Sequence, residues 1–226
     1  MRRITVKDLP AVTVTVVLVT AAVSIAGLAH PEVLAALQRR PVSNASWLSW
    51  RLVTSLFVHD GGLPLAFNLV GLAIVGTTVE RRMGAARWLV IYFVCGIVGE
   101  FAGIHWQPVG AGNSVATFGL VGAIAAETFS RDGAPTTLAV LLAAEWVLVY
   151  TGLEVDGTVG AVVASALCAP LSAVAGRLSR TAPRAVNMRL TVGTLALAAA
   201  LCAMRDIHGP PLIVGAILAL TFRRRT

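Results

Sequence analysis

Ser114 is the residue of this sequence with the clearest potential for chemistry. It lies within residues 110 to 123, where a glycine-rich stretch runs into an apolar one. Glycines let the backbone approach a ligand closely, and free N–H groups at a helix start can bind a developing oxyanion. Ser114 is therefore a candidate nucleophile for acyl transfer. The alternative is a small residue that eases a helix contact beside Gly119 and Gly122.

A nucleophilic serine needs a general base, and the chain has four histidines: His30, His59, His105 and His208. His208 is the best candidate because it begins the last apolar run, as Ser114 begins an earlier one. Both runs predict short helices, about 24 Å and about 21 Å long, against about 30 Å of hydrocarbon. We therefore expect both side chains at similar depth below one membrane surface, as a Ser–His dyad. A histidine in an interfacial loop is the alternative.

Transmembrane helices are the elements expected to position these two residues. Of the 226 residues, 57% are hydrophobic and 13% are charged, which excludes an ordinary soluble domain. Long apolar runs predict an all-α, polytopic membrane bundle of about eight helices, forming one domain over residues 1–226. The runs lie at about 11–29, 63–79, 88–104, 114–129, 134–152, 157–176, 190–204 and 209–222.

Basic residues predict the orientation of these helices. The formal net charge is +7, and a cytoplasmic N-terminus leaves only Arg39, Arg40, Arg51 and Arg205 of the 18 Lys and Arg residues outside. Because Lys and Arg are retained on the cytoplasmic side, we expect both termini there, with Ser114 facing outward. Short basic clusters between apolar runs favour the lipid bilayer over nucleic acid as partner. The composition favours a bacterial plasma membrane.

Residues 30–62 form an outer segment too long for a hairpin. Trp47, Trp50 and Phe57, together with the Arg39–Arg40 pair, predict a stretch lying in the membrane interface. An ordinary outer loop is the alternative.

Other polar side chains in the apolar runs favour structural roles. Glu100, Glu127 and Glu145 are expected to be hydrogen-bond partners or to reach the membrane surface, although they could also line a transport path. The three cysteines, Cys95, Cys168 and Cys202, fall in apolar runs without metal-ligand spacing. We therefore expect buried small side chains here, with no disulfide framework and no zinc site.

Four short motifs resemble the rhomboid family of intramembrane serine proteases, in that family's order and spacing. The resemblance is widest over residues 50 to 123 and rests on Trp50–His59 (WRLVTSLFVH), Phe67–Leu69 (FNL), Val79–Gly84 (VERRMG) and Gly112–Ser114 (GNS). It implies a helical bundle, with its core at about 50–222, whose serine and histidine meet in a water-filled cavity. It also implies cleavage of single-span membrane proteins near their outer ends.

The resemblance assigns roles to individual residues. Ser114, in the Gly-x-Ser box that begins with Gly112, would be the nucleophile, and His208 would be the base. Asn68 and the Ser114 backbone N–H would stabilise the oxyanion, and the Phe118 ring would pack against the histidine. Acyl transfer of this kind needs no metal and no organic cofactor, so we expect neither. The sequence carries no signal for an oligomeric state.

Three features depart from the family pattern. Pro64 stands where many members have a second histidine, and Val115 follows the serine where a smaller residue is usual. His208 lies about four predicted spans after Ser114, whereas the simplest members have two; an even number of spans preserves sidedness. These departures motivate an alternative function, a catalytically inactive rhomboid-like protein that binds membrane clients. A transporter or channel is the third hypothesis, against which no inverted repeat is visible between the two halves of the sequence.

Overall fold

The computed structural model describes residues 10–40, 50–130 and 134–223. The described residues contain helices and no strand, apart from one isolated antiparallel bridge between Arg39 and Gly110. The all-α prediction is thus confirmed. The helices are α1 (Ala11–Ala29), α2 (Pro31–Leu37), α3 (Arg51–Thr54), the 3₁₀ turn η2 (Ser55–Phe57), α4 (Gly62–Met83), α5 (Ala85–Trp106), α6 (Ser114–Thr128), α7 (Thr137–Leu178), α8 (Pro183–Ala203) and α9 (Gly209–Arg223).

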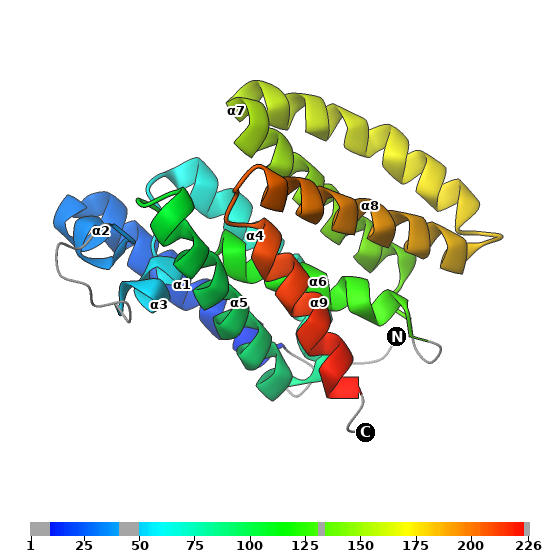
Figure 1. Cartoon of the computed structure of the whole chain (residues 1–226), viewed down its shortest axis with the longest axis horizontal. Coiled ribbons are helices and arrows are strands. Elements are labelled where there is room, and N and C mark those ends of the chain that lie inside the picture. The colour runs from blue at the N-terminus through cyan, green and yellow to red at the C-terminus, as the bar shows by residue number, and fades with distance from the viewer. Residues whose placement is uncertain (1–9, 41–49, 131–133, 224–226) are drawn as a thin grey trace.

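Every apolar run predicted to be a helix is helical in the structure. Helix α7 combines the two runs predicted at 134–152 and 157–176, and it is interrupted at Asp156 and Gly157, whose backbone angles are not helical. Gly157 has a φ of 55°, a value that glycine adopts without strain. The two halves of α7 run back along each other (Figure 1), and a Cβ on Gly152 or Gly160 would overlap the other residue's carbonyl oxygen.

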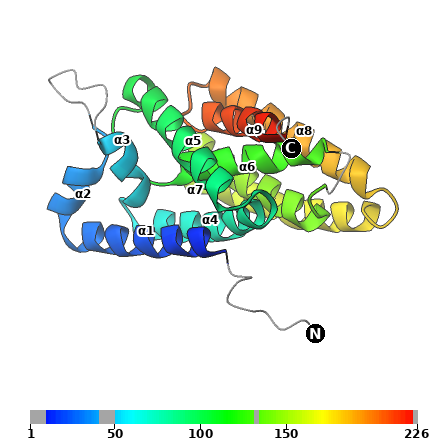
Figure 2. The same ribbon diagram turned by 90° about the horizontal axis from the view of Figure 1, so that it is seen from below.

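Helix α6 lies at the centre of the bundle (Figure 1) and contacts α4, α5, α7, α8 and α9. All its residues except Glu127 are buried. In Figure 2, α1 lies along one side of the bundle, and α8 and α9 lie along the opposite side. A helix that is apolar all round belongs in the interior, so the apolar character of 114–129 explains its central position.

Helices α6 and α9 are shorter than the helices around them. Five of the described helices, α1, α4, α5, α7 and α8, are long and apolar enough to cross a membrane. In contrast, α6 and α9 have 15 residues each, or about 22 Å at 1.5 Å per residue. The predicted shortness of the helices that begin at Ser114 and after His208 is therefore confirmed.

The segment at 30–62 contains short helices, α2, α3 and η2, rather than a hairpin. Trp50 is 55% exposed, as an interfacial tryptophan would be, but Arg39 is buried, at 2% exposure. Arg39 forms an ion pair with Glu100 of α5, so it lies inside the protein rather than at a membrane surface. Trp47 and the basic residues within 1–9, 131–133 and 224–226 lie outside the described residues.

The three membrane-embedded glutamates each have a partner. Glu100 pairs with Arg39, Glu127 Oε2 accepts a hydrogen bond from Arg82 at 3.0 Å, and Glu145 Oε1 accepts one from Ser172 Oγ at 2.5 Å. The first two contacts join separate elements and the third joins the two halves of α7, as expected for structural carboxylates. All three cysteines are free.

Candidate active site

A cavity of about 230 Å³ opens beside the first turn of α6. Its wall includes residues from α4, α5, α6 and α7, from the loops before α4, α6 and α9, and from the segment after α2: Arg39, Asp60, Pro64, Asn68, Glu100, Gln107, Gly112, Ser114, Val115, Tyr150, Glu154 and His208. A cavity with several polar groups converging on it is the usual form of a binding or active site.

Ser114 is the first residue of α6 and is 5% exposed. The first N–H groups of a helix have no partner within it, so the Ser114 N–H can donate to another acceptor. The loop before it turns at Gly112, whose φ of 127° favours glycine and whose N–H donates to the Ser55 carbonyl at 2.8 Å. A Cβ there would also lie 3.3 Å from His59 Nε2. The backbone conformation at position 112, two residues before the serine, therefore requires a glycine.

His208 immediately precedes α9, and its Nε2 lies 2.9 Å from Ser114 Oγ. Both side chains are buried, although they are 94 residues apart in the sequence. The distance is within hydrogen-bond reach, so the structure brings together the two residues that the sequence analysis paired.

Two aromatic rings hold the imidazole of His208. The Phe118 ring centroid lies 4.8 Å from that of His208, as the sequence analysis expected. The Tyr150 ring of α7 lies closer, at 4.5 Å, and it also contacts Phe118 at 5.4 Å. Tyr150 was missed in the sequence, where its only signal was an aromatic residue near the outer end of a predicted span.

Asp206 is a second residue that the sequence analysis did not place in the site. Its Oδ1 accepts hydrogen bonds from His208 Nδ1 at 2.7 Å and from the His208 backbone N–H at 2.9 Å. Its Oδ2 accepts a third from Gln107 Nε2 at 3.2 Å. Burial alone would raise the pKa of the Asp206 carboxyl, but the bonds from His208 and Gln107 outweigh burial and lower it. The signal was an Asp two residues before His208, a spacing that allows an Asx turn.

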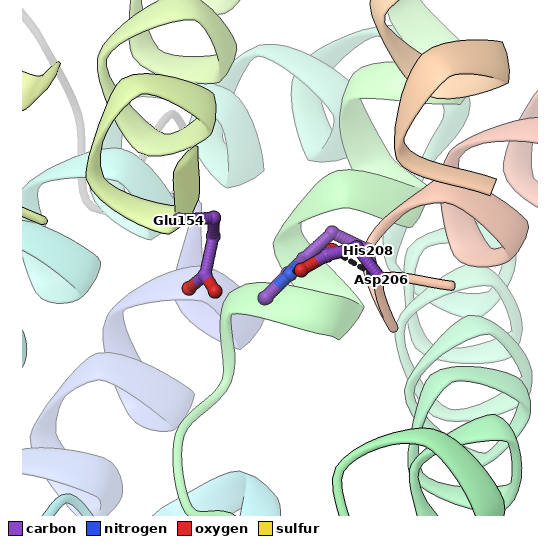
Figure 3. A group of neighbouring side chains, drawn as sticks. All are labelled: Glu154, Asp206 and His208. Carbon is purple, nitrogen blue, oxygen red and sulfur yellow. Dashed lines mark hydrogen bonds and ion pairs between the residues drawn. The ribbon is translucent and has the colours of Figure 1, made fainter. Parts of the chain in front are cut away.

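Glu154 of α7 is a second carboxylate near the His208 imidazole. Figure 3 shows its side chain pointing towards His208, with the His208–Asp206 hydrogen bond dashed. Ligand atoms of Glu154, Asp206 and His208 lie within 4.8 Å of one another, so the three could hold a metal ion. However, His208 Nδ1 and Asp206 Oδ1 already bond to each other, and His208 Nε2 faces Ser114. The expectation of no metal stays a prediction.

The expected oxyanion residues surround the same cavity. Asn68 of α4 is 3% exposed, and its Oδ1 has no hydrogen-bond partner among the described residues. Its Nδ2 lies 3.6 Å from where a Gly112 Cβ would be, so the amide stands beside the loop that leads to Ser114. Pro64, one helical turn earlier on the cavity wall, offers no donor.

Val115 is accommodated although it is larger than the residue usual in the family. It is 1% exposed, and a Cβ on Gly99 of α5 would lie 2.7 Å from the Val115 Cβ. The missing side chain at Gly99 thus provides the space that Val115 fills.

Comparison with known proteins identifies the family. The rhomboid domain model matches residues 46–165, just over half of the chain. The chain is 43% identical over 84 residues to "Rhomboid protease GluP" of Bacillus subtilis, covering 37% of this chain and 16% of that protein. It is 41% identical over 80 residues to "Rhomboid-like protease 3" of Toxoplasma gondii, covering 34% of this chain and 30% of that protein. It is also 40% identical over 77 residues to "Inactive RHOMBOID-like protein 8" of Arabidopsis thaliana, covering 33% and 22%.

These matches span less than a third of each of those three relatives, and the matched domain ends before His208. The relatives include both proteases and a protein named as inactive. The helical architecture, the apolar helices and the domain match together show an integral, multi-pass membrane protein. The chain belongs to the rhomboid family.

Proposed function

We propose that this protein is an intramembrane serine protease that cleaves single-span membrane proteins, with Ser114 as nucleophile and His208 as general base. The observation that carries the proposal is the 2.9 Å contact between the buried Ser114 Oγ and His208 Nε2, beside the cavity. A serine hydroxyl is a weak nucleophile unless an adjacent base removes its proton, and this contact supplies the base.

The proposed reaction proceeds in two stages. Ser114 Oγ attacks the scissile carbonyl carbon while His208 Nε2 takes the hydroxyl proton, and the protonated imidazole then gives that proton to the leaving amine. A water molecule hydrolyses the resulting acyl-enzyme by the same proton transfers in reverse. The Ser114 N–H and Asn68 Nδ2 would donate to the oxyanion at each stage.

Pro64 offers no hydrogen-bond donor to the oxyanion, so we expect the reaction to be slower than in a site that has a donor at this position. The loss of one oxyanion donor typically lowers kcat by about 10² to 10³. The same observation favours the second candidate function, an inactive rhomboid-like protein that binds membrane clients. That reading also fits the similarity to a relative named as inactive.

Both termini are proposed to be cytoplasmic, because most basic residues then lie on that side. The α7–α8 connection, residues 179–182, would be cytoplasmic in this arrangement, and Ser114 would face the bacterial cell exterior. Cysteine introduced at Thr181 should react with a membrane-impermeant maleimide only after permeabilisation. Reaction in intact cells would reverse the orientation.

Cleavage in reconstituted liposomes tests the protease proposal. Wild type should cut a model single-span substrate, and Ser114→Ala and His208→Ala should each lower turnover by at least about a thousandfold. His105→Ala is the matched control, because His105 is exposed near the end of α5 and should leave turnover unchanged. A folded wild type that binds the substrate without cutting it would support the inactive function instead.

A further inference from the structure

The sequence predicts a Ser–His dyad, but in the structure a third group lies against the histidine. Asp206 Oδ1 accepts a hydrogen bond from His208 Nδ1 at 2.7 Å, on the side of the ring opposite Ser114. We infer that Asp206 is a positioning residue that orients His208 and stabilises its protonated form, so that the protein works with a Ser–His–Asp triad. The inference rests on the proposed protease function.

The carboxylate fixes which nitrogen of His208 carries the proton. An ionised Asp206 can only accept hydrogen bonds, so the proton of a neutral imidazole must lie on Nδ1. Nε2 then presents a lone pair to Ser114 Oγ, which is the state a general base requires. The same oxygen of Asp206 accepts the His208 backbone N–H at 2.9 Å, so carboxylate and imidazole are held as one unit.

The position of the carboxylate is itself fixed from the far side. Gln107 Nε2 donates to Asp206 Oδ2 at 3.2 Å, and the Gln107 carbonyl accepts from Arg39 Nη2 at 2.7 Å and Nε at 3.2 Å. Arg39 in turn pairs with Glu100. Asp206 and Arg39 are 5% and 2% exposed, respectively. Gln107 is half-buried, so the network is largely shielded from water, which strengthens its hydrogen bonds and helps to hold the carboxylate in place.

Asp206 is therefore placed to stabilise the positive charge that develops on His208 during the reaction. When His208 takes the Ser114 proton, the imidazole becomes a cation 2.7 Å from a carboxylate, which lowers the free energy of that state. Other titratable or charged groups also face this unit: Glu100 of α5, Tyr150 and Glu154 of α7, Cys202 of α8, and Arg39 and Asp60 of the loops. Among the hydrogen bonds of the described residues, only that of Asp206 reaches His208 Nδ1.

The test compares Asp206→Asn and Asp206→Ala with Asp156→Asn, a matched control. Asp156 is exposed at the interruption of α7 and does not line the cavity. We expect Asp206→Ala to lower kcat by roughly a hundredfold or more, with KM changed less than about twofold. Asp206→Asn keeps the shape and can keep a neutral hydrogen bond, so it should lower kcat by roughly tenfold or more. Asp156→Asn should match wild type.

The pH dependence of kcat/KM shows whether Asp206 acts on His208 through its charge or only fills space beside it. Because the carboxylate stabilises the imidazolium, its loss makes protonation of the base harder, so the acid limb of kcat/KM should move to lower pH in Asp206→Asn. Both Asp206 variants retaining the kcat and pH profile of wild type, with unchanged melting temperature, would overturn the inference.

A measurement independent of turnover distinguishes this inference from the proposed function. In protein with ¹⁵N-labelled histidine, NMR should show the neutral His208 protonated at Nδ1 in wild type and mainly at Nε2 in Asp206→Ala. Absence of Ser114-dependent cleavage would refute the protease proposal alone. The same tautomer in wild type and Asp206→Ala would refute the role of Asp206, whatever the activity.

Discussion

Gly215 of α9 offers a direct way to change the distance between the two helices that hold Ser114 and His208. In the structure, a Cβ on Gly215 would overlap the carbonyl oxygen of Gly119 in α6 and would lie 2.8 Å from the Gly119 Cα. Ordinary contact begins at 3.4 Å. Gly215→Ala therefore requires α9 to move away from α6 by more than the difference at the Gly119 Cα, about 0.6 Å, because the overlap with the carbonyl oxygen is larger still and closely packed backbones cannot interpenetrate.

Such a movement would stretch the contact between the reacting groups. Ser114 Oγ and His208 Nε2 are 2.9 Å apart, so a displacement of about 0.6 Å takes them beyond the hydrogen-bond range of about 2.6 to 3.2 Å. A misplacement of about 1 Å can lower a catalytic rate by a hundredfold. We expect Gly215→Ala to lower kcat by roughly tenfold to a hundredfold, and overpacking to destabilise the fold by about 1 to 3 kcal/mol.

The assay is liposome cleavage, with thermal unfolding measured on the same samples. Gly193→Ala is the matched control, because Gly193 is exposed in the middle of α8 and a Cβ there meets no atom within 4 Å. It should leave turnover unchanged and stabilise the helix by about 0.5 to 1 kcal/mol. A Gly215→Ala protein with the turnover and melting temperature of wild type would refute the claim that α6–α9 contact sets the Ser114–His208 distance.

Three further predictions concern the oxyanion residues, acid stability and metal dependence. Asn68→Ala should lower turnover by roughly a hundredfold while Pro64→His raises it, because each changes the number of donors near the oxyanion; turnover unchanged by both would place the oxyanion elsewhere. Burial lowers the pKa of His59 from 6.5 to about 4, so the unfolded state binds more protons between these pH values. Melting temperature should therefore fall as the pH drops from 6.5 towards 4, and His59→Gln should flatten this slope; an equal slope in both proteins would contradict it. EDTA should leave turnover unchanged, because acyl transfer by a serine and a histidine needs no metal; activity lost to EDTA and restored by a divalent cation would instead indicate a metal at Glu154, Asp206 and His208.

The sequence predicted those parts of the molecule that depend on local pattern. The lengths of the apolar runs identified the helices. Two of the predicted helices are short and begin on the same side of the membrane, which is why Ser114 and His208 were paired. Such inferences work in a membrane protein because every spanning segment must be long, apolar and internally hydrogen bonded.

The positions of the residues that the sequence did not predict depend on contacts between segments far apart in the chain. Arg39 was expected in the interface, yet it is buried against Glu100, 61 residues away. Gln107 reaches Asp206 across 99 residues, and neither side chain lies in a recognisable pattern. Asp206 was missed, because its role requires a loop geometry that residue spacing merely permits. The positions of such polar groups follow from the three-dimensional packing and not from hydropathy.

The central claim, that His208 activates Ser114, is tested most directly by labelling with a fluorophosphonate probe and locating the adduct by mass spectrometry. Wild type should carry the adduct on Ser114, and both Ser114→Ala and His208→Ala should lose it, because a hydroxyl without its base is too weak a nucleophile. His105→Ala should be labelled as wild type is. Labelling of Ser114 that persists in His208→Ala, or a folded wild type that does not react at Ser114, would contradict the account.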